Sequence, residues 1–156
     1  MSGKNSAANK SGIVPLNLSE LDQVFALDQL CFPKGVAFSK SLFRYFLTSP
    51  DCVTFGIKDH QSLFGFIIVQ AQSRQKARLI TLDICPEQRR KKLGQALLEH
   101  AHDFLRQSGF KLIVLETAIN NPAAIALYEK LGYERTGISE RFYPDGTDAL
   151  LMEKEF

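Results

Sequence analysis

The amino-acid sequence predicts an α+β protein, with one mixed sheet of about seven strands and helices on both of its faces. Strand-like and helix-like runs follow one another in the order βααβββαβαββ. Turn residues such as Pro, Gly, Asn and Asp separate these runs. The length of 156 residues, with 45% hydrophobic and 23% charged residues, fits one globular domain.

The first elements are a short strand at residues 13–16 and two helices. The first helix runs to about residue 30, and we expect Ser19 to cap it because Ser accepts hydrogen bonds from the free N–H groups of a first turn. Ser39 offers a second cap, for a short amphipathic helix that ends before Pro50.

Three strand-like runs follow, at residues 53–58, 62–73 and 77–84. Short polar joints connect them, as in an antiparallel meander. A helix is expected over residues 92–108, where apolar side chains recur at helical spacing before Gly109. His100 falls on this apolar stripe and is interpreted as a core histidine.

The remaining elements are a buried strand at residues 111–116, a helix and two last strands. Asn121-Pro122 opens the helix in the favoured order of cap and then proline, and Gly132 closes it. The runs 133–142 and 148–156 flank a turn and complete the sheet.

Composition and charge exclude several classes of protein. The net charge is only +2, too small for bulk binding to nucleic acid or to an acidic membrane. No apolar run reaches the length of a membrane span, and the polar residues 1–12 predict a disordered tail ahead of a single domain at 13–156. The three cysteines, Cys31, Cys52 and Cys85, form no disulfide or metal-binding pattern, so we expect a cytoplasmic protein without a metal.

The charge is concentrated at one strand-to-helix junction. Residues 74–92 contain seven basic and two acidic residues, and the four cations Arg89 to Lys92 stand directly before a helix. The first N–H groups of a helix have no internal partner, so this junction predicts a site for phosphate groups. A solvated run of charges is the alternative. The glycine-rich loops of ATP-binding and dinucleotide-binding proteins do not occur.

Two motifs resemble those of the GNAT acyl-CoA N-acyltransferase superfamily. Residues 89–94 (RRKKLG) resemble its Q/R-x-x-G/A-x-G/A motif, with Lys92 at the place of a small residue. Residues 121–133 (NPAAIALYEKLGY) match N-x-x-A-x-x-L-Y-x-x-x-G-F/Y throughout. The resemblance extends from Ile13 to Phe156.

Within the superfamily, the chain is most similar to ribosomal-protein alanine N-acetyltransferases and other protein N-terminal acetyltransferases. The segments CFP at 31–33, LET at 115–117 and FYPDGTDALLM at 142–152 carry this similarity. The family usually has a Trp near Phe38, and this chain contains none. The resemblance implies transfer of acetyl from acetyl-CoA to a protein or peptide α-amine, with a ribosomal protein among the candidate acceptors. We expect this transfer to be direct, within a ternary complex.

The same resemblance implies the site residues. Acetyl-CoA would be bound by backbone groups of one strand, by the basic loop and helix start, and by one asparagine: Leu82, Asp83, Ile84, Arg89, Arg90, Lys91, Lys92, Leu93, Gly94, Gln95 and Asn121. The acceptor would contact Phe38 and Tyr143, although Tyr143 can equally be an exposed turn residue.

Glu116 and Tyr128 are the catalytic candidates. The resemblance makes Glu116 the general base that takes a proton from the acceptor ammonium, and Tyr128 the acid that protonates the leaving thiolate. A phenol is protonated at neutral pH, which suits this role. A solvated or salt-bridged glutamate and a core tyrosine are the alternatives.

Other functions remain open at this stage. The acceptor can be a small amine or a lysine side chain, and a CoA-binding module without turnover is also conceivable. A nucleic-acid-binding protein is disfavoured because aromatic residues do not interleave with the basic run. Cys85 lacks a neighbouring pattern that would activate it for a covalent route.

Overall fold

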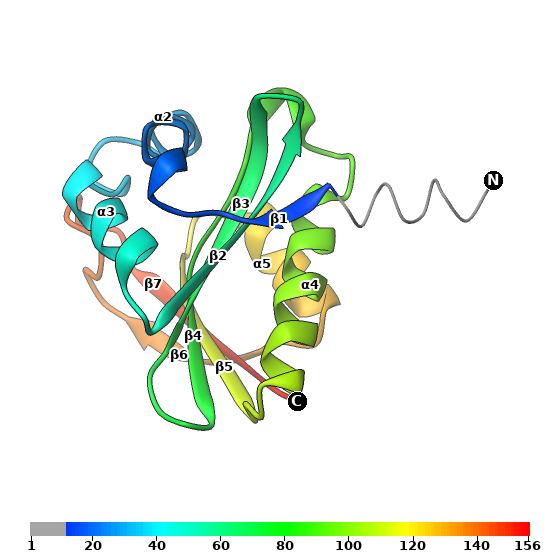
Figure 1. Ribbon diagram of the computed structural model, residues 1–156. Coiled ribbons are helices and arrows are strands. Elements are labelled where there is room, and N and C mark those ends of the chain that lie inside the picture. Colours follow the sequence, from blue (N-terminus) through cyan, green and yellow to red (C-terminus); the bar gives the residue numbers. More distant parts are fainter. Residues whose placement is uncertain (1–11) are drawn as a thin grey trace.

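The computed structural model describes residues 12–156 and shows one seven-stranded sheet between two layers of helix (Figure 1). The order βααβββαβαββ and the α+β class agree with the prediction. The expected disordered tail lies outside the described residues except for Gly12. The elements are β1 (Ile13–Pro15), α2 (Leu21–Cys31), α3 (Lys40–Thr48), β2 (Cys52–Asp59), β3 (Ser62–Ala71), β4 (Lys76–Ile84), α4 (Leu93–Gln107), β5 (Leu112–Ala118), α5 (Pro122–Lys130), β6 (Glu134–Ser139) and β7 (Ala149–Glu155).

The sheet opens between two of its strands. Its order is β1-β2-β3-β4-β5-β7-β6, and the β4–β5 pair alone is parallel. These two strands pair only as far as Leu79 and Leu115, after which both continue without pairing to each other. In the β3–β4 ladder Ile68 faces Thr81 and Val69 faces Leu79, which leaves one extra residue in β4. Such a bulge bends its strand, so β4 turns away from β5 at this point.

Each face of the sheet has its own core. Phe66 and Ile68 of β3 point to one face, where they pack with residues of α2 and α3. Ile67 and Val69 alternate to the other face, which α4 and α5 cover (Figure 1). The aromatic ring of Phe43 on α3 meets that of Phe66 edge to face at 5.9 Å.

The start of α2 differs from the prediction. A 3₁₀ turn, Leu18–Glu20, comes first, and the Asn17 side chain caps it by accepting a hydrogen bond from the Ser19 N–H at 2.9 Å. The Glu20 side chain accepts from the Asn17 N–H at 2.7 Å and completes a capping box. The prediction that Ser19 caps the helix is therefore wrong. The helix α2 begins at Leu21, and the side chain of its N-cap residue, Glu20, makes no capping hydrogen bond to it.

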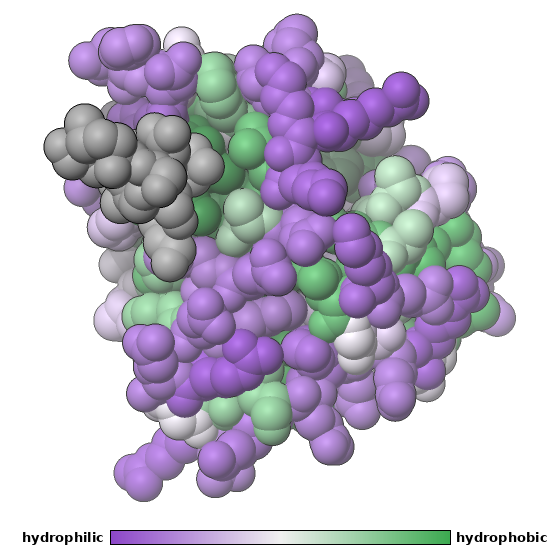
Figure 2. Space-filling model, turned by 90° about the vertical axis from the view of Figure 1, so that its right-hand side faces the viewer, coloured by the Kyte–Doolittle hydropathy of each residue, from purple (hydrophilic) through white to green (hydrophobic). Residues whose placement is uncertain are grey.

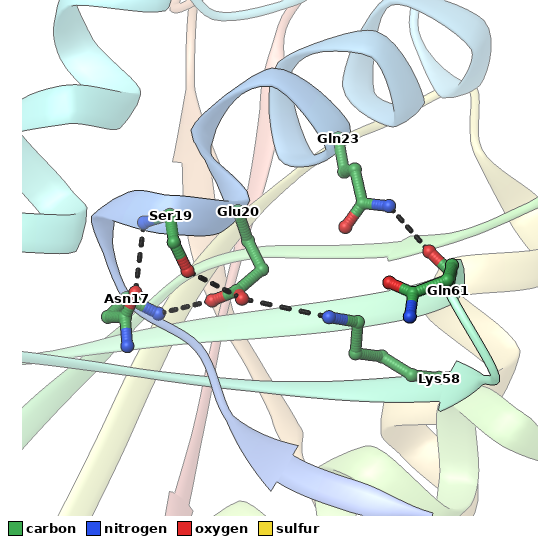
Figure 3. Close-up of polar contacts among 6 residues, drawn as sticks. All are labelled: Asn17, Ser19, Glu20, Gln23, Lys58 and Gln61. Atoms are coloured by element: carbon green, nitrogen blue, oxygen red, sulfur yellow. Dashed lines mark hydrogen bonds and ion pairs between the residues drawn. The ribbon is translucent and has the colours of Figure 1, made fainter.

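Polar contacts fasten this N-terminal region to the β2–β3 hairpin (Figure 3). Lys58 of β2 lies 3.6 Å from the Glu20 carboxylate. Gln23 of α2 donates a hydrogen bond to the Gln61 carbonyl in the hairpin turn at 2.6 Å. These contacts tie the capping box and the start of α2 to the end of the β2–β3 hairpin.

Two other predicted caps are confirmed, but the buried histidine of α4 is not the predicted one. Ser39 accepts from the Leu42 N–H at 3.1 Å to cap α3, and Asn121 caps α5. The fully buried histidine of α4 is His102, 3% exposed, rather than the half-buried His100. His102 lies four residues after the buried Leu98, so it falls on the same helix face.

The side of the molecule covered by α4 is mostly hydrophilic, with hydrophobic side chains exposed in small separate areas (Figure 2). This distribution agrees with an α4 that buries one apolar stripe against the sheet. Among residues 12–156, none of the helices has both the length and the apolar character needed to cross a membrane.

Candidate functional site

Two adjoining cavities lie where β4 and β5 separate. The larger, about 680 Å³, is called the basic cavity; it is bounded by the end of β4, the loop 85–92 and the starts of α4 and α5. The smaller, about 260 Å³, is called the cleft cavity; it lies between the separated strands and the loops 32–38 and 143–147. Most predicted cofactor residues line the basic cavity: Leu82, Ile84, Arg89, Arg90, Lys92, Leu93, Gly94, Gln95 and Asn121.

The N-terminus of α4 opens into the basic cavity. Its first helical hydrogen bond runs from the Ala96 N–H to the Lys92 carbonyl, so the preceding N–H groups have no partner inside the helix. Lys92 supplies no side-chain cap. Arg90 and Lys92 have positive φ angles of 66° and 61° in the left-handed region. Such alternating backbone turns direct N–H groups toward a common anion.

The cations of the loop are available to a ligand. None of the ion pairs found among residues 12–156 involves Arg89, Arg90, Lys91 or Lys92. Lys91 donates a hydrogen bond to the Gln88 side chain at 2.9 Å and is not part of the cavity lining. Lys130, at the end of α5, joins the lining although the sequence did not single it out. The basic cavity therefore combines free amides with free positive charges.

Gly94 allows α4 to approach its neighbours closely. A Cβ atom at this position would lie 3.3 Å from the Leu127 side chain of α5 and 3.7 Å from Ile84 of β4. A larger residue would push the helix start away from α5 and β4, which bound the cavity. The second small residue of the motif thus has a packing role here.

The last residues of β4 present a free strand edge to the cavities. Beyond Leu79 this edge no longer pairs with β5, so its unpaired backbone groups can bond to a ligand. The Ile84 carbonyl is already engaged, because it accepts hydrogen bonds from the Cys31 thiol at 3.3 Å and from the Arg89 Nε at 3.2 Å. Leu82 and Ile84 line the basic cavity. The Asp83 side chain does not: it is 1% exposed and accepts a hydrogen bond from Thr81 at 2.5 Å. Any role of Asp83 in cofactor binding is therefore confined to its backbone.

Tyr128 of α5 stands where the two cavities meet, since it lines both. Its side chain is 6% exposed. Burial, with smaller effects from Asp83 and Tyr143, raises the pKa of Tyr128 above its usual value. The hydroxyl therefore keeps its proton at neutral pH and can donate it.

Glu116 of β5 lines the cleft cavity and is paired with Arg78 of β4. The Arg78 Nε donates to the Glu116 Oε1 at 2.8 Å, and its terminal nitrogen donates to the same oxygen. Glu116 lies within β5, opposite Leu151 of β7, rather than at the strand end. The guanidinium stabilises the negative charge of this carboxylate inside the cleft.

Two loops form the outer walls of the cleft cavity. Phe38 lies in the loop before α3 and Tyr143 in the loop before β7, and both line the cavity. Their contact with an acceptor stays a prediction. The loops touch, because a Cβ atom on Gly35 would be 3.3 Å from the Asp145 Cβ. Burial, with a smaller effect of the Glu116 charge, raises the pKa of Tyr143 to about 12.

The cysteines near the site are unsuited to nucleophilic attack. Cys31 of α2 lines both cavities, and burial raises the pKa of its thiol to about 11. Cys85 donates a hydrogen bond to Glu87 at 2.8 Å, which raises the pKa of its thiol. A thiol must ionise to be an effective nucleophile, so both are inert at neutral pH.

Sequence reasoning did not assign Arg78, Asp28 or Cys31 to the site. Arg78 was counted in the basic segment, but its partner follows only from the pairing of β4 with β5. Asp28 has a local signal, because it lies four residues after the buried Val24 on the same face of α2. A charged residue on an apolar stripe indicates a buried polar contact.

Known proteins share both the sequence pattern and the fold. The sequence profile of the Acetyltransferase (GNAT) family matches residues 21–133. The ribosomal protein bS18-alanine N-acetyltransferase of Escherichia coli (strain K12) is 37% identical over 103 residues, which cover 64% of this chain and 69% of that protein. N-alpha-acetyltransferase 30 of Schizosaccharomyces pombe is 31% identical over 117 residues, covering 72% of this chain and 78% of the relative.

Solved structures agree with these matches. The crystal structure of the ribosomal-protein-S18-alanine N-acetyltransferase from Escherichia coli has a TM-score of 0.83 at 30% identity and covers 92% of both chains. The crystal structure of Arabidopsis thaliana NAA60 in complex with acetyl-CoA has a TM-score of 0.82 at 16% identity, covering 92% of this chain and 97% of that one; at this identity it shows the fold alone.

The profile match spans most of the chain, and the fold agrees with that of the solved acetyltransferase structure. The protein belongs to the GNAT family of acetyltransferases.

Proposed function

We propose that this acetyltransferase moves an acetyl group from acetyl-CoA to the α-amine of a protein or peptide N-terminus. The observation that carries the proposal is the meeting of the two cavities at Tyr128, with unpaired cations on one side and the Glu116 carboxylate on the other. The acceptor class is supported by the names of the two relatives, one an alanine N-acetyltransferase of ribosomal protein bS18 and one an N-alpha-acetyltransferase.

The residues of the basic cavity fit coenzyme A. Free N–H groups at the start of α4, with Arg90 and Lys92, suit the diphosphate. The free edge of β4 at Leu82 and the Asn121 side chain suit the amide groups of the pantetheine arm. Acetyl-CoA would supply the activated acetyl group as a thioester and depart as the thiol.

Glu116 is proposed to receive the proton of the acceptor ammonium, directly or through water. An α-amine has a pKa of about 8, so it is largely protonated at neutral pH and must lose a proton before it can attack. Glu116 lines the cleft cavity, its side chain is 18% exposed, and Arg78 donates two hydrogen bonds to its Oε1. Arg78 does not bond to the Oε2 atom, so this oxygen is proposed to take the proton.

Tyr128 is proposed to return a proton to the departing sulfur. Its hydroxyl keeps its proton at neutral pH, as burial requires, and its place between the cavities lies next to both reactants. Over one turnover the acceptor nitrogen loses two protons, one before attack and one after it; one of them replaces the proton that Tyr128 gives to the sulfur, and the other is released to solvent.

Direct transfer in a ternary complex is proposed rather than an acetyl-cysteine route. The two cavities adjoin, so both substrates can be bound together. The raised pKa values of Cys31 and Cys85 leave neither thiol ionised at neutral pH.

A panel of synthetic peptides tests the acceptor class. The purified protein is incubated with acetyl-CoA and, in separate reactions, with each peptide of several matched pairs. The two peptides of a pair contain the same internal lysine, and one has a free and the other a blocked α-amine. The first pair begins with the N-terminal residues of ribosomal protein bS18, the substrate named for the relative in Escherichia coli. Fragmentation mass spectrometry then locates the acetyl group.

We expect acetylation of the free α-amine and none of the blocked peptide. Activity confined to the lysine of the blocked peptide would replace the proposed acceptor by a side-chain amine. Binding of acetyl-CoA in calorimetry without turnover of any amine would instead support a CoA-binding module.

A further inference from the structure

Two carboxyl groups outside the proposed catalytic pair are buried together beside the cleft cavity. Asp28 of α2 and Asp83 of β4 are each 1% exposed, and their side chains are hydrogen-bonding neighbours. Asp28 also lines the cleft cavity. Neither residue belongs to the acid–base pair of Glu116 and Tyr128.

Two of the four carboxyl oxygens have a hydrogen-bond donor among the described residues. Asp28 Oδ2 accepts a hydrogen bond from the Phe38 N–H at 2.8 Å. Asp83 Oδ1 accepts from the Thr81 hydroxyl at 2.5 Å. Within residues 12–156, Asp28 Oδ1 and Asp83 Oδ2 are buried and have no donor among the other groups. A single proton between these two oxygens would satisfy both.

Two adjacent buried carboxylates cannot both remain charged, because desolvation and mutual repulsion favour one shared proton. Burial, followed by the hydrogen bond and charge of Asp28, raises the pKa of Asp83 well above its usual value. Burial also raises the pKa of Asp28, while its hydrogen bonds with Asp83 and Phe38 oppose that shift. The proton therefore resides on Asp83, and Asp28 is the charged acceptor.

We infer that Asp28 and Asp83 are positioning residues of the acceptor pocket, joined by one shared proton that fixes the loop 32–38 against the end of β4. Asp28 transmits the contact through the Phe38 N–H, and Phe38 forms part of the cleft cavity wall. On the other side, Asp83 lies between Leu82 and Ile84, whose side chains line the basic cavity. The bridge thus sets the distance between the acceptor wall and the cofactor strand.

The groups that face this pair come from three elements. Arg89, in the loop after β4, lowers the pKa of Asp83 by its charge, as the Thr81 hydrogen bond does. Cys31 of α2 and Tyr128 of α5 are neutral at physiological pH, because burial, with a smaller effect of the carboxyl pair, raises the pKa of both side chains. Among residues 12–156, Arg89 is the one cation found to act on the pair, so a shared proton is the main compensation for its charge.

The inference rests on the proposed function only where it takes the cleft cavity as the acceptor site. Its test compares Asp83→Asn, whose amide N–H can replace the shared proton, with Asp83→Leu, which has similar volume and no donor. Thr54→Val is the control, because Thr54 is a buried residue of β2 that also has an unpartnered oxygen and is not part of either cavity lining.

Asp83→Leu is expected to raise the KM for a peptide at least about tenfold, since the charge on Asp28 loses its donor. The Kd for acetyl-CoA should change less than about twofold, because the Asp83 side chain is turned away from that cavity. Asp83→Asn and Thr54→Val should keep both constants near their wild-type values. An Asp83→Asn variant as impaired as Asp83→Leu, or an unimpaired Asp83→Leu, overturns the inference.

Two measurements need neither activity nor the leucine variant. A folded state that holds a proton lost on unfolding becomes less stable as pH rises, so the Tm advantage of Asp83→Asn over wild type should grow between about pH 5 and about pH 9. The infrared band of a protonated carboxyl should be present at neutral pH in wild type and absent in Asp83→Asn. A constant Tm difference, or no such band, refutes the shared proton even if every peptide proves to be a substrate.

Discussion

The Arg78 Nε on β4 lies 2.8 Å from the Glu116 Oε1 on β5, at the point where these parallel strands stop pairing. Arg78 is opposite Val114 in the ladder, and the last pair is Leu79 with Leu115. The side chains of Arg78 and Glu116 therefore connect the two strands just beyond the last backbone pair. It also places a charged carboxylate at the base of the cleft.

Replacing Glu116 by Gln should lower kcat/KM for the peptide mainly at low pH. Below the pKa of the α-amine, at about 8, the reaction requires a base to remove the ammonium proton, while at higher pH the free amine is already present. Initial rates across the pH range measure the change, with Glu99→Gln on the exposed face of α4 as control. An identical pH profile for Glu116→Gln and wild type would remove Glu116 from this role.

Replacing Arg78 by Met should lower kcat/KM for the peptide about tenfold and leave the Kd for acetyl-CoA within about twofold of its wild-type value. Without the guanidinium, the Glu116 carboxylate loses the two hydrogen bonds that hold it in the cleft, whereas Arg78 is not part of the basic cavity lining. Initial rates and calorimetry measure the two effects. An unchanged kcat/KM would show that the ion pair only holds the strands together.

Replacing Tyr128 by Phe should reduce kcat by about 10²-fold or more, because the leaving sulfur loses its proton donor. Tyr133→Phe is the matched control: Tyr133 is also buried, but its hydroxyl bonds to His102 at 2.7 Å within the core. That variant should lose about 1 kcal/mol of stability and keep its kcat. Equal kcat losses in both variants would point to packing rather than proton transfer.

Replacing Lys92 by Gly should stabilise the fold and weaken acetyl-CoA binding. The left-handed backbone of Lys92 costs an L-residue about 1–2 kcal/mol, and part of this strain disappears with glycine. Loss of the cation beside the phosphates should raise the Kd about threefold. Denaturant unfolding and calorimetry measure the two effects.

Lys91→Gly is the control for the Lys92 variant, because Lys91 has no positive φ and is not on the cavity lining. It should lose stability and leave the Kd nearly unchanged. Tighter binding by Lys92→Gly would mean that the lysine side chain obstructs the cofactor.

His102 should make the protein less stable in mild acid. Burial lowers the pKa of His102 to about 4, against an unfolded value near 6.5, so between these pH values the unfolded state alone takes up the proton. Stability is therefore lost as pH falls through this window, by up to about 3 kcal/mol. His102→Gln can still bond to the Tyr133 hydroxyl and does not titrate, so its Tm should fall less steeply. Parallel Tm curves would show that His102 is not responsible.

The sequence by itself determined the class and order of the elements. Side-chain periodicity, Ser39 and Asn121 as caps, and Gly after helices are local features, and the structure confirms them. It also indicated the basic helix start, since four consecutive cations need no partner elsewhere in the chain to be recognised. Where a local rule failed, at Ser19, an additional 3₁₀ turn had shifted the helix start.

Only the tertiary structure decided how the site is assembled. The pairing of Arg78 with Glu116 joins residues 38 positions apart, and it depends on a strand register that the periodicity of neither strand specifies. The bulge in β4 opens the cleft, and the burial of Asp28 against Asp83 depends on how α2 packs over the sheet. These contacts arise from the packing of distant segments, because burial and neighbouring charge, rather than residue type, determine what each carboxyl group can do.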